Sequence, residues 1–383
     1  MALPLRYNFR SLLRRKTQAA MTALGIGLAV LVSVLMLALS AGLMNSIRAT
    51  GHPLNVLVTS KGAESTEFSA IDLRELDVLR FSPNVALKDG QSLASPEVYF
   101  TTQVEIAPGS PPTQALVRGV LPLALPVHDQ VQVTAGRFPN QPGEIMVGAL
   151  VPINLGVSSE RLAIGQSLVF EGTRWKIVGQ FAAPGTAFES EIWGPLDDLM
   201  VAARRSELSS IVVRARDAAA LKEMLFDFAT RSDVLVEARQ ETAYYAASAE
   251  AFWPVQFMVY VMTGMLVLGG VFVGMNTLFA AVMTRIREIG VLRTVGYRRW
   301  DIALAFLIES LVPALVGGAL ACLLALGLNG FALRIPMGAF RFEIGPFLLG
   351  AGMGLSVLIG VLGAAWPLWR SARLKTVDAI RHL

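Results

Sequence analysis

The sequence TRIREIGVLRTVGYRRWDIA, residues 284–303, lies between two of the most apolar segments of the chain. It combines two glycines with five arginines: Gly290, Gly296, Arg285, Arg287, Arg293, Arg298 and Arg299. Charged side chains are costly inside a bilayer, so such a cluster beside apolar runs is typical of a loop outside the hydrocarbon. Composition agrees, because 54% of the 383 residues are hydrophobic and only 16% are charged, whereas soluble domains are about 25% charged. We therefore expect a membrane protein.

Most hydrophobic residues fall into four blocks, which we predict to be transmembrane helices. They cover residues 19–44, 251–284, 302–333 and 344–369. At about 1.5 Å per residue the first block reaches ~39 Å, more than the ~30 Å hydrocarbon core. The second would reach ~51 Å as a helix, so we expect it to combine a stalk outside the membrane with the second span.

Basic residues set the orientation of these spans. Residues 1–18, 285–301 and 370–383 carry them in excess, whereas the short loop of residues 334–343 has only Arg334 and Arg341. By the positive-inside rule, both termini and the quoted loop lie in the cytoplasm, and the short loop lies outside. We expect residues 1–18 to form an amphipathic helix, residues 370–383 a tail, and residues 45–250 an extracytoplasmic domain.

The first block has an alternative interpretation as a cleaved signal peptide. LALSAG, residues 37–42, offers small residues at which a peptidase could cut. The apolar run is much longer than the core of a signal peptide, about 7–15 residues, which favours a permanent span.

Residues 45–250 change to a pattern of short strands with a few helices. Two β-rich runs around Gly172 and Thr173 predict a hairpin over residues 165–181. Residues 217–231 have helical periodicity and begin with Asp217, a favourable N-cap. Further strands are expected at residues 54–60, 97–106, 113–120 and 208–215, and a helix at residues 71–80. The expected fold class is a membrane α-helical protein, with four transmembrane helices and a large α+β extracytoplasmic domain between spans 1 and 2.

Few features support catalysis, and we expect no catalytic residue and no metal site. No lysine follows a glycine, so a phosphate-binding P-loop is absent from the sequence, as is the G-x-S-x-G motif of hydrolases. The histidines His52, His128 and His382 have no cysteine or carboxylate at ligand spacing. An acidic patch is expected to be a solvated loop, with a cation site as the alternative: Glu189, Glu191, Asp197 and Asp198.

Glu309 is the one charged residue inside the third apolar block. An intramembrane carboxylate is a functional candidate by default. Two interpretations remain open. The carboxylate pairs with an arginine of the quoted loop near the interface, or it acts directly on substrate or protons.

Two G-x-x-x-G pairs lie in the predicted spans, Gly270 with Gly274 and Gly350 with Gly354. Small residues let helices approach closely, so we expect both pairs at helix contacts. Contact within one subunit and contact with a second subunit both remain open.

The quoted loop itself predicts a short helix over residues 284–295. Val291, Leu292 and Val295 share one face, and Gly296 suits the left-handed position that ends a helix. Physical reasoning leaves two partners open for this helix, anionic lipid and another protein.

The segment REIGVLRTVGYRRWDIALAFLIESLVPALVGG, residues 287–318, resembles the coupling helix of MacB/FtsX/LolC-type (type VII) ABC transporter permeases. Residues 8–30 are similar to the N-terminal helix and first span of that family. Residues 143–181 are similar to its periplasmic core domain, and residues 369–383 to its C-terminal tail. The resemblance therefore covers nearly the whole chain.

The resemblance implies that the loop docks on a cytoplasmic ATPase subunit. The expected docking residues are Arg287, Glu288, Gly290, Arg293 and Gly296, and Glu309 matches a glutamate common in the family. Tyr297 and Trp300 are bulkier than expected after the motif glycine, which could tune the choice of partner. The ATPase domain fused in MacB is not found in this sequence, so a separate ATPase chain that binds ATP and Mg²⁺ is expected. No cofactor is expected in this chain.

The family also implies a dimer with a second copy or a paralogue, and work by mechanotransmission rather than through a channel. We expect the non-catalytic permease subunit of an inner-membrane ABC transporter that drives export or extraction of a lipophilic or peptide cargo. A periplasmic adaptor is a further expected partner. The alternatives are a lipoprotein-release permease and a non-transporting, FtsX-like activator of envelope hydrolases.

Overall fold

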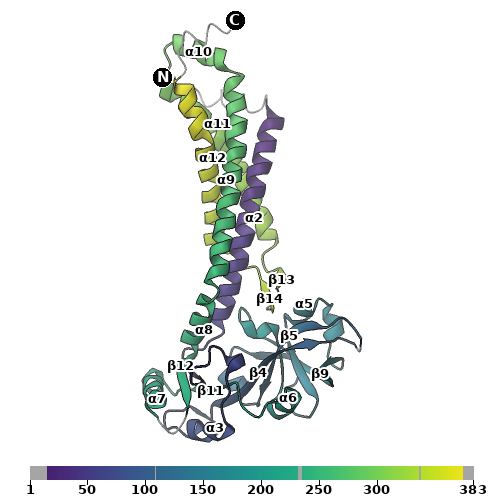
Figure 1. The fold of residues 1–383 in the computed structure, drawn as a ribbon. Coiled ribbons are helices and arrows are strands. Elements are labelled where there is room, and N and C mark those ends of the chain that lie inside the picture. The colour runs from purple at the N-terminus through teal and green to yellow at the C-terminus, as the bar shows by residue number, and fades with distance from the viewer. Residues whose placement is uncertain (1–14, 108, 232–234, 336–337, 374–383) are drawn as a thin grey trace. The chain divides into compact units, whose positions relative to one another are not determined.

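The computed structural model describes residues 15–107, 109–231, 235–335 and 338–373, which form two compact units (Figure 1). The membrane unit consists of the described residues of Met1–Ala41, Pro254–Phe331 and Phe342–Leu383. The extracytoplasmic unit consists of those of Gly42–Trp253 and Ala332–Arg341. Most of the expected amphipathic helix at residues 1–18 and of the tail at residues 370–383 lies outside the described residues.

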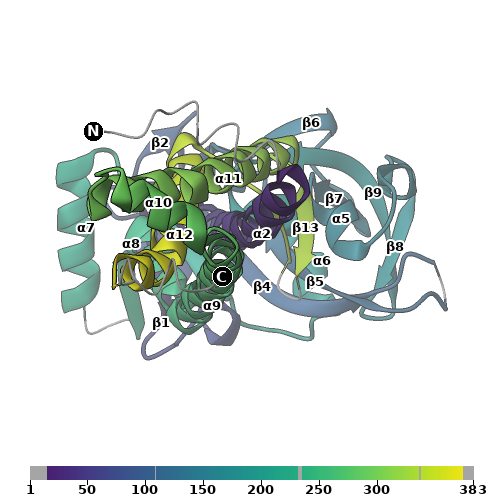
Figure 2. The ribbon, with the colours of Figure 1, turned by 90° about the horizontal axis from the view of Figure 1, so that it is seen from above.

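Four long apolar helices build the membrane unit: α2 (Lys16–Ala49), α9 (Trp253–Met283), α11 (Arg299–Gly327) and α12 (Pro346–Arg373). Each is long and apolar enough to cross a bilayer, where a helix satisfies its own backbone hydrogen bonds. The short helix α10 (Ile286–Thr294) joins α9 to α11 and runs across the bundle axis rather than along it (Figures 1 and 2). The expected four-helix membrane architecture is confirmed.

Glycines let the helices of the membrane unit meet backbone to backbone. A Cβ atom added at Gly317 of α11 would lie 2.2 Å from the carbonyl oxygen of Ala23 in α2. One added at Gly27 would lie 2.9 Å from the carbonyl oxygen of Gly317. On the next face of α11, Gly318 leaves room for Ser356 of α12. The hydroxyl group of Ser356 is thereby buried between the two helices.

The connection between the third and fourth spans differs from the expected loop. The sequence places the third span at residues 302–333, but α11 ends at Gly327, and Gly330 takes a left-handed φ of +78° as the chain turns. The following residues form a β-hairpin of β13 (Ala332–Ile335) and β14 (Gly338–Arg341). This hairpin belongs to the extracytoplasmic unit, although it is joined at both ends to membrane helices.

A ten-stranded mixed sheet forms the centre of the extracytoplasmic unit. Its main path runs β12-β1-β11-β4-β5-β10-β7-β9-β6, and β8 pairs with β9 off this path. The pairs β5–β10 and β7–β9 are parallel, and the other pairs are antiparallel. The strands are β1 (Asn55–Ser60), β4 (Ala94–Val104), β5 (Thr113–Val120), β6 (Gln132–Gly136), β7 (Glu144–Gly148), β8 (Ser167–Phe170), β9 (Thr173–Ala182), β10 (Glu191–Pro195), β11 (Ser210–Arg214) and β12 (Val236–Gln240). A separate ribbon pairs β2 (Leu87–Lys88) with β3 (Gln91–Ser92).

The predicted hairpin is confirmed in β8 and β9, where Phe170 lies opposite Thr173. Its turn residues are Glu171 and Gly172, with φ values of +49° and +70°. Two left-handed residues in succession give the turn a twist that matches the twist of the strands.

Short helices connect the strands of the extracytoplasmic unit: η1 (Thr66–Phe68), α3 (Leu73–Arg80), α4 (Ala124–Val127), α5 (Val151–Leu155), η2 (Ser159–Leu162), η3 (Ala187–Ser190), α6 (Leu196–Ala202), α7 (Ala218–Thr230) and α8 (Glu241–Glu250). The predicted helix at residues 217–231 is α7, and the carboxylate of Asp217 accepts hydrogen bonds from the backbone amides of Ala219 and Ala220. The expected N-cap is therefore confirmed, as is the α+β class of the domain.

One face of the sheet is apolar and forms the main core of this unit. Strand alternation places Val56 and Val58 of β1 on this face, together with Ile211 and Val213 of β11. These residues belong to one buried cluster with side chains of three helices: Leu79 of α3, Leu199 of α6 and Met224 of α7.

The other face of the sheet carries buried polar groups, and here one expectation is wrong. Glu189 and Glu191 are expected in a solvated loop, but they are only 3% and 2% exposed. Glu191 begins β10 and pairs with Arg118 of the neighbouring strand β5 at 2.7 Å. His128 likewise contacts Glu97, which is 31 residues away in the chain. Spacing along the sequence does not reveal either contact.

The β13–β14 hairpin is held on this unit by Ser190. The Ser190 hydroxyl donates to the carbonyl oxygen of Ala339 at 2.8 Å and accepts from the Ala339 amide at 3.2 Å. Beside it, Glu189 lies 3.9 Å from Arg341 of the hairpin. Burial raises the pKa of the Glu189 carboxyl, and the charge of Arg341 opposes this effect.

Candidate functional site

The candidate site is the end of the membrane unit at which α10 joins α9 to α11. Helix α10 ends as the sequence predicts, because Gly296 takes a left-handed φ of +105°. The Gly296 amide donates to the carbonyl oxygen of Arg293, and the Tyr297 amide donates to that of Leu292. These two bonds stop the helix and turn the chain into α11.

The two sides of α10 have different surroundings. Leu292 and Tyr297 pack against a buried cluster of α9, α11 and α12 that contains Leu278, Val282, Ile302, Phe306 and Ala364. Val291 and Val295 face away from the bundle and are 55% and 72% exposed. Trp300, at the start of α11, is also exposed. The apolar face expected from the sequence is thus divided between an inward and an outward side.

The expected docking residues do not all lie on the outward side of α10. Glu288 and Gly296 are exposed, Arg293 is half-buried, and Gly290 is buried within the chain. Arg287 lies in the first turn of α10. Only part of the family motif therefore belongs to the exposed surface, and the buried part contributes to how α10 is seated on the bundle.

Glu309 is buried in α11, and its carboxylate pairs with Arg285. The Glu309 Oε2 atom lies 3.3 Å from the Nη1 atom of Arg285, and the two side chains are 9% and 11% exposed. Arg285 is the residue that caps the start of α10, and its Nε atom lies 3.9 Å from Glu288. The structure thus contains the pair with a loop arginine that the first interpretation of Glu309 expects. The pair connects the start of α10 to the middle of the next span.

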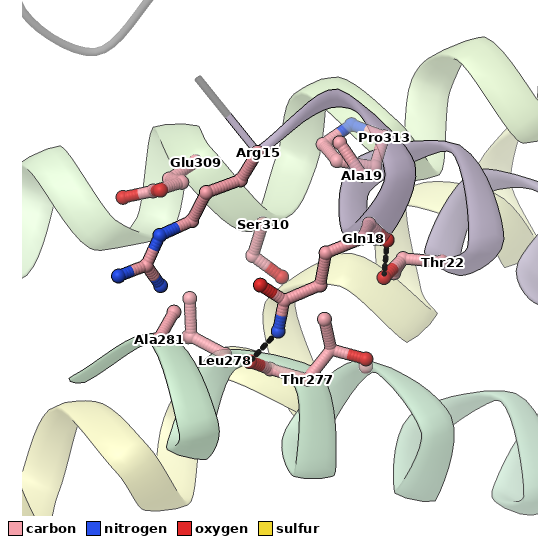
Figure 3. A pocket seen from close by; sticks show the side chains of 11 residues that line it. Arg15, Gln18, Ala19, Thr22, Thr277, Leu278, Ala281, Glu309, Ser310 and Pro313 are labelled. Atoms are coloured by element: carbon pink, nitrogen blue, oxygen red, sulfur yellow. Dashed lines mark hydrogen bonds between the residues drawn. The ribbon is translucent and has the colours of Figure 1, made fainter. Parts of the chain in front are cut away.

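A cavity of about 40 Å³ with mostly apolar walls opens beside Glu309 between α2, α9 and α11 (Figure 3). Arg15, directly before α2, lies at its edge with Glu309, and its guanidinium donates to the hydroxyl of Thr284. Deeper in the cavity, Gln18 donates to the backbone carbonyl of Thr277 at 3.3 Å. A cavity of this size has room for about one water molecule beside the Glu309 carboxylate.

This cavity contains residues that sequence reasoning missed. Arg15 and Gln18 lie near the N-terminus, more than 250 residues from Thr284 and Thr277. Ser310 donates to the backbone carbonyl of Gly360 at 2.8 Å and so connects α11 to α12. No spacing rule relates these positions, and only the helix pairing brings them together.

The two G-x-x-x-G pairs have different environments. A Cβ atom added at Gly270 would lie 3.0 Å from Ile359 of α12, and one at Gly274 would lie 3.8 Å from the Cα atom of Gly363. Added Cβ atoms at Gly350 and Gly354 would meet no described residue within 4 Å. The first pair therefore lies at a helix contact within the chain, and the second faces open space.

Comparisons with known proteins match both parts of the chain. The model of the MacB-like periplasmic core domain matches residues 19–230, and that of the FtsX-like permease C-terminal region matches residues 260–376. The macrolide export ATP-binding/permease protein MacB of Bdellovibrio bacteriovorus is 24% identical over 424 residues, covering 99% of this chain and 61% of the relative. The protein of the same name from Photorhabdus laumondii is 29% identical over 243 residues, covering 58% and 36%.

The chain spans less than two thirds of the length of either relative. Among solved structures, the periplasmic region of MacB from Actinobacillus actinomycetemcomitans aligns with a TM-score of 0.40 at 11% identity, covering 51% of this chain and 92% of that structure.

Proposed function

Because the chain belongs to the MacB/FtsX (type VII) family of ABC transporter permeases, we propose that it couples ATP hydrolysis by a cytoplasmic ATPase to movement of its extracytoplasmic unit. In this proposal the ATPase docks on α10, and the membrane helices transmit the motion. Substrate does not need a channel through the bundle, because the work is done outside the membrane.

The observation that carries the proposal is the two-sided packing of α10. Its inward residue Leu292 is anchored among three membrane helices, whereas Val291 and Val295 are left exposed. Exposed apolar side chains at the end of a helical bundle favour a protein partner, because their burial on docking is worth about 25 cal/mol per Å². Glu288 and Gly296 border the same surface and provide polar contacts at its rim.

The Arg285–Glu309 pair supports the coupling step. A force applied to α10 reaches α11 through this buried ion pair as well as through the backbone. Buried pairs of this kind are strongly destabilised when one partner is lost, since the other charge is left uncompensated. The pair therefore makes α10 and α11 move as one body.

The connectivity of the chain supports transmission to the extracytoplasmic unit. That unit is made from two segments, Gly42–Trp253 and Ala332–Arg341. The first is continuous with α2 and α9, and the second with α11 and α12. All four membrane helices are thus covalently joined to it, and Ser190 binds the second segment to the first.

The cargo and the remaining partners belong to the same proposal. The named relatives are macrolide export proteins, which supports a lipophilic or peptide cargo for this chain. A second permease copy would complete a dimer, and Gly350 and Gly354 offer it a surface without neighbours among the described residues. A periplasmic adaptor would receive the exported cargo.

Co-purification from the native host tests the docking step. The tagged chain is expected to retain an ABC ATPase, identified by mass spectrometry, at close to one ATPase per permease. Val291→Asp combined with Val295→Asp should reduce this yield at least tenfold, because both carboxylates would be buried on docking. Both positions are exposed, so the variant should fold as the wild type does.

Val201→Asp is the matched control for this experiment. Val201 is 78% exposed, close to the 72% of Val295, but it lies on α6 of the extracytoplasmic unit. It should leave ATPase retention unchanged. Wild-type retention by the double variant on α10 would exclude the docking surface, whatever the control shows.

A further inference from the structure

The two ends of the main extracytoplasmic segment meet at one point. The chain enters after α2 through Thr50, Gly51 and His52, and it leaves through α8, which begins at Glu241. A Cβ atom at Gly51 would lie 2.8 Å from the Cα atom of Thr242, so the two backbones are in direct contact. The His52 amide donates to the Oε2 atom of Glu241 at 2.8 Å. We call this meeting point the joint.

Glu241 holds the joint to the sheet with one of its two oxygens. Its Oε2 atom also accepts from the side-chain amide of Asn55 in β1 at 2.8 Å. Asn55 in turn donates to the backbone carbonyl of Val127 at 3.1 Å. The carboxylate is completely buried, yet its Oε1 atom has no hydrogen-bond partner among the described residues.

A row of buried charges continues from Glu241 across the sheet. The Nε2 atom of His128 lies 2.6 Å from the Oε1 atom of Glu97. The other oxygen of Glu97 accepts from Arg118 at 2.6 Å, and Arg118 donates two further bonds to Glu191, at 2.7 and 2.8 Å. Every member of the row is at most 5% exposed. The row therefore connects α8 to strands β4, β5 and β10.

The row contains one gap, between His128 and Glu241. The Nδ1 atom of His128 faces the Oε1 atom of Glu241 at 3.7 Å, and neither atom has a hydrogen-bond partner in the described part of the chain. Buried polar atoms in folded proteins are nearly always paired. Two unpaired atoms that face each other indicate a bond that forms in one state of the joint and is open in another.

Protonation decides whether this bond can form. Burial raises the pKa of Glu97, but the charges of His128 and Arg118 outweigh it and hold that pKa at about 2. Glu97 is therefore an acceptor near neutral pH, and the Nε2 atom of His128 must carry a proton. In neutral His128 the Nδ1 atom therefore has no proton, and its lone pair faces the lone pairs of the Glu241 carboxylate. One added proton between Nδ1 and Oε1 turns this repulsion into a hydrogen bond.

We propose that His128 and Glu241 form a proton-dependent latch, which holds α8 on the sheet when one proton lies between them and releases it when that proton is lost to solvent. The latch would set how firmly α8, which leads along the chain into α9, is held on the sheet. This role goes beyond docking and ATP-driven coupling, and it does not depend on them.

The surrounding charges determine the direction in which the pKa values of the two latch residues shift. Burial lowers the pKa of His128, but Glu97 and Glu241 raise it above its ordinary value overall. Burial also raises the pKa of Glu241. The groups that face the latch are Glu97 of β4, Arg118 of β5, Glu191 of β10, Tyr245 of α8 and His52 before β1. Because both pKa values are raised, the latch is closed at low pH and opens as pH rises through the folded pKa of the pair.

Hydrogen exchange of the full chain in nanodiscs tests the latch. Protection of the backbone amides of α8 is measured between pH 5.5 and 9 and corrected for the intrinsic exchange rate. In the wild type it should fall at least tenfold over this range. His128→Gln removes the imidazole that shares the proton, so its α8 protection at pH 5.5 should be lower than that of the wild type and should change less with pH. A wild-type protection that does not change with pH would overturn the proposal.

Glu241→Gln provides a sharper result, and it covers the case in which His128→Gln fails to fold. The amide oxygen must occupy the Oε2 position, because His52 and Asn55 both donate there. The amide NH₂ then faces Nδ1 and can donate to a neutral imidazole but not to an imidazolium. The pH dependence should therefore reverse, with higher protection at high pH. Wild-type behaviour of Glu241→Gln would contradict the latch.

Discussion

Arg285 and Glu309 show how single residues can connect two elements of a membrane protein. Burying either charge alone in an apolar bundle costs free energy, but at 3.3 Å each offsets the charge of the other. Their separation of 24 residues places one at the start of α10 and the other inside α11. The sequence allowed a loop arginine as the partner of Glu309 but did not identify which one, because several arginines lie within reach.

Glu309→Gln should uncouple ATP hydrolysis from transport more than it reduces hydrolysis itself. The amide keeps a hydrogen-bond acceptor but removes the buried negative charge that lies 3.3 Å from Arg285, a loss on the order of 1–3 kcal/mol. We expect transport per ATP hydrolysed to fall about tenfold in proteoliposomes. Asp301→Asn is the control, since it removes a carboxylate eight positions earlier that caps α11. Equal transport per ATP in Glu309→Gln and wild type would remove the ion pair from the coupling path.

The low pKa of Glu97 predicts how the stability of the extracytoplasmic unit changes in acid. Its pKa in the folded chain is about 2, below the ordinary value of 4.5. Its stabilising effect is therefore complete above pH 4.5 and is lost as pH falls from 4.5 towards 2. Fluorescence of Trp193, which donates to Glu191 in the same buried row, should report the loss of structure. Glu97→Gln should be less stable than the wild type at pH 7, and its stability should depend less on pH below 4.5. If the stability of the wild type and of Glu97→Gln fell by the same amount between pH 4.5 and 2, this account would be ruled out.

At the scale of elements, close glycine contacts determine how the membrane helices pack. The contact of Gly317 with Ala23 leaves no space for a side chain, whereas Gly264 of α9 has nothing within 4 Å of an added Cβ atom. The two positions therefore separate the packing role of glycine from its effect on helix propensity.

Gly317→Ala should destabilise the protein, while Gly264→Ala should not. Overpacking at Gly317 costs about 1–3 kcal/mol, because a backbone must move. At Gly264 the same change removes the entropic penalty of glycine and stabilises by up to about 1 kcal/mol. Thermal unfolding in one detergent measures both variants. A Gly317→Ala protein as stable as Gly264→Ala would show that the α2–α11 contact is looser than described.

Elements with local signals were predictable from the sequence, and elements that depend on distant partners were not. The α7 helix has its own N-cap in Asp217, and the β8–β9 hairpin has its own turn at Gly172, so both are encoded locally. The β13–β14 hairpin has only short strands, and Ser190 holds it from about 150 positions away. A loop was the natural expectation there.

Dependence on distant partners also explains why the sequence did not predict the polar row of the extracytoplasmic unit. Glu191 appeared to belong to an acidic surface patch, because its partner Arg118 is 73 residues away. His128 appeared to have no carboxylate nearby for the same reason. A charged residue is expected at the surface unless an oppositely charged partner is known. Here the pairing of strands distant in the sequence brings the partners together, so they are visible only in the folded chain.

At the scale of the whole molecule, the family assignment and the membrane architecture followed from the sequence, whereas the paths between the parts required the structure. The Arg285–Glu309 pair and the Ser190 contact each connect segments that the sequence separates. Together with the covalent junctions of the four helices, they form the route along which we propose that ATP-driven motion travels.

The most direct test of this route is hydrogen exchange of the extracytoplasmic unit in the permease–ATPase complex, with and without ATP. In wild-type nanodiscs, ATP should change exchange in the β13–β14 hairpin and in α8. The Val291→Asp, Val295→Asp double variant should show no such change, while Val201→Asp should respond as the wild type does. Coupling through α10 would be contradicted if ATP did not change hydrogen exchange of the extracytoplasmic unit in the wild type. It would also be contradicted if ATP changed this exchange equally in the double variant.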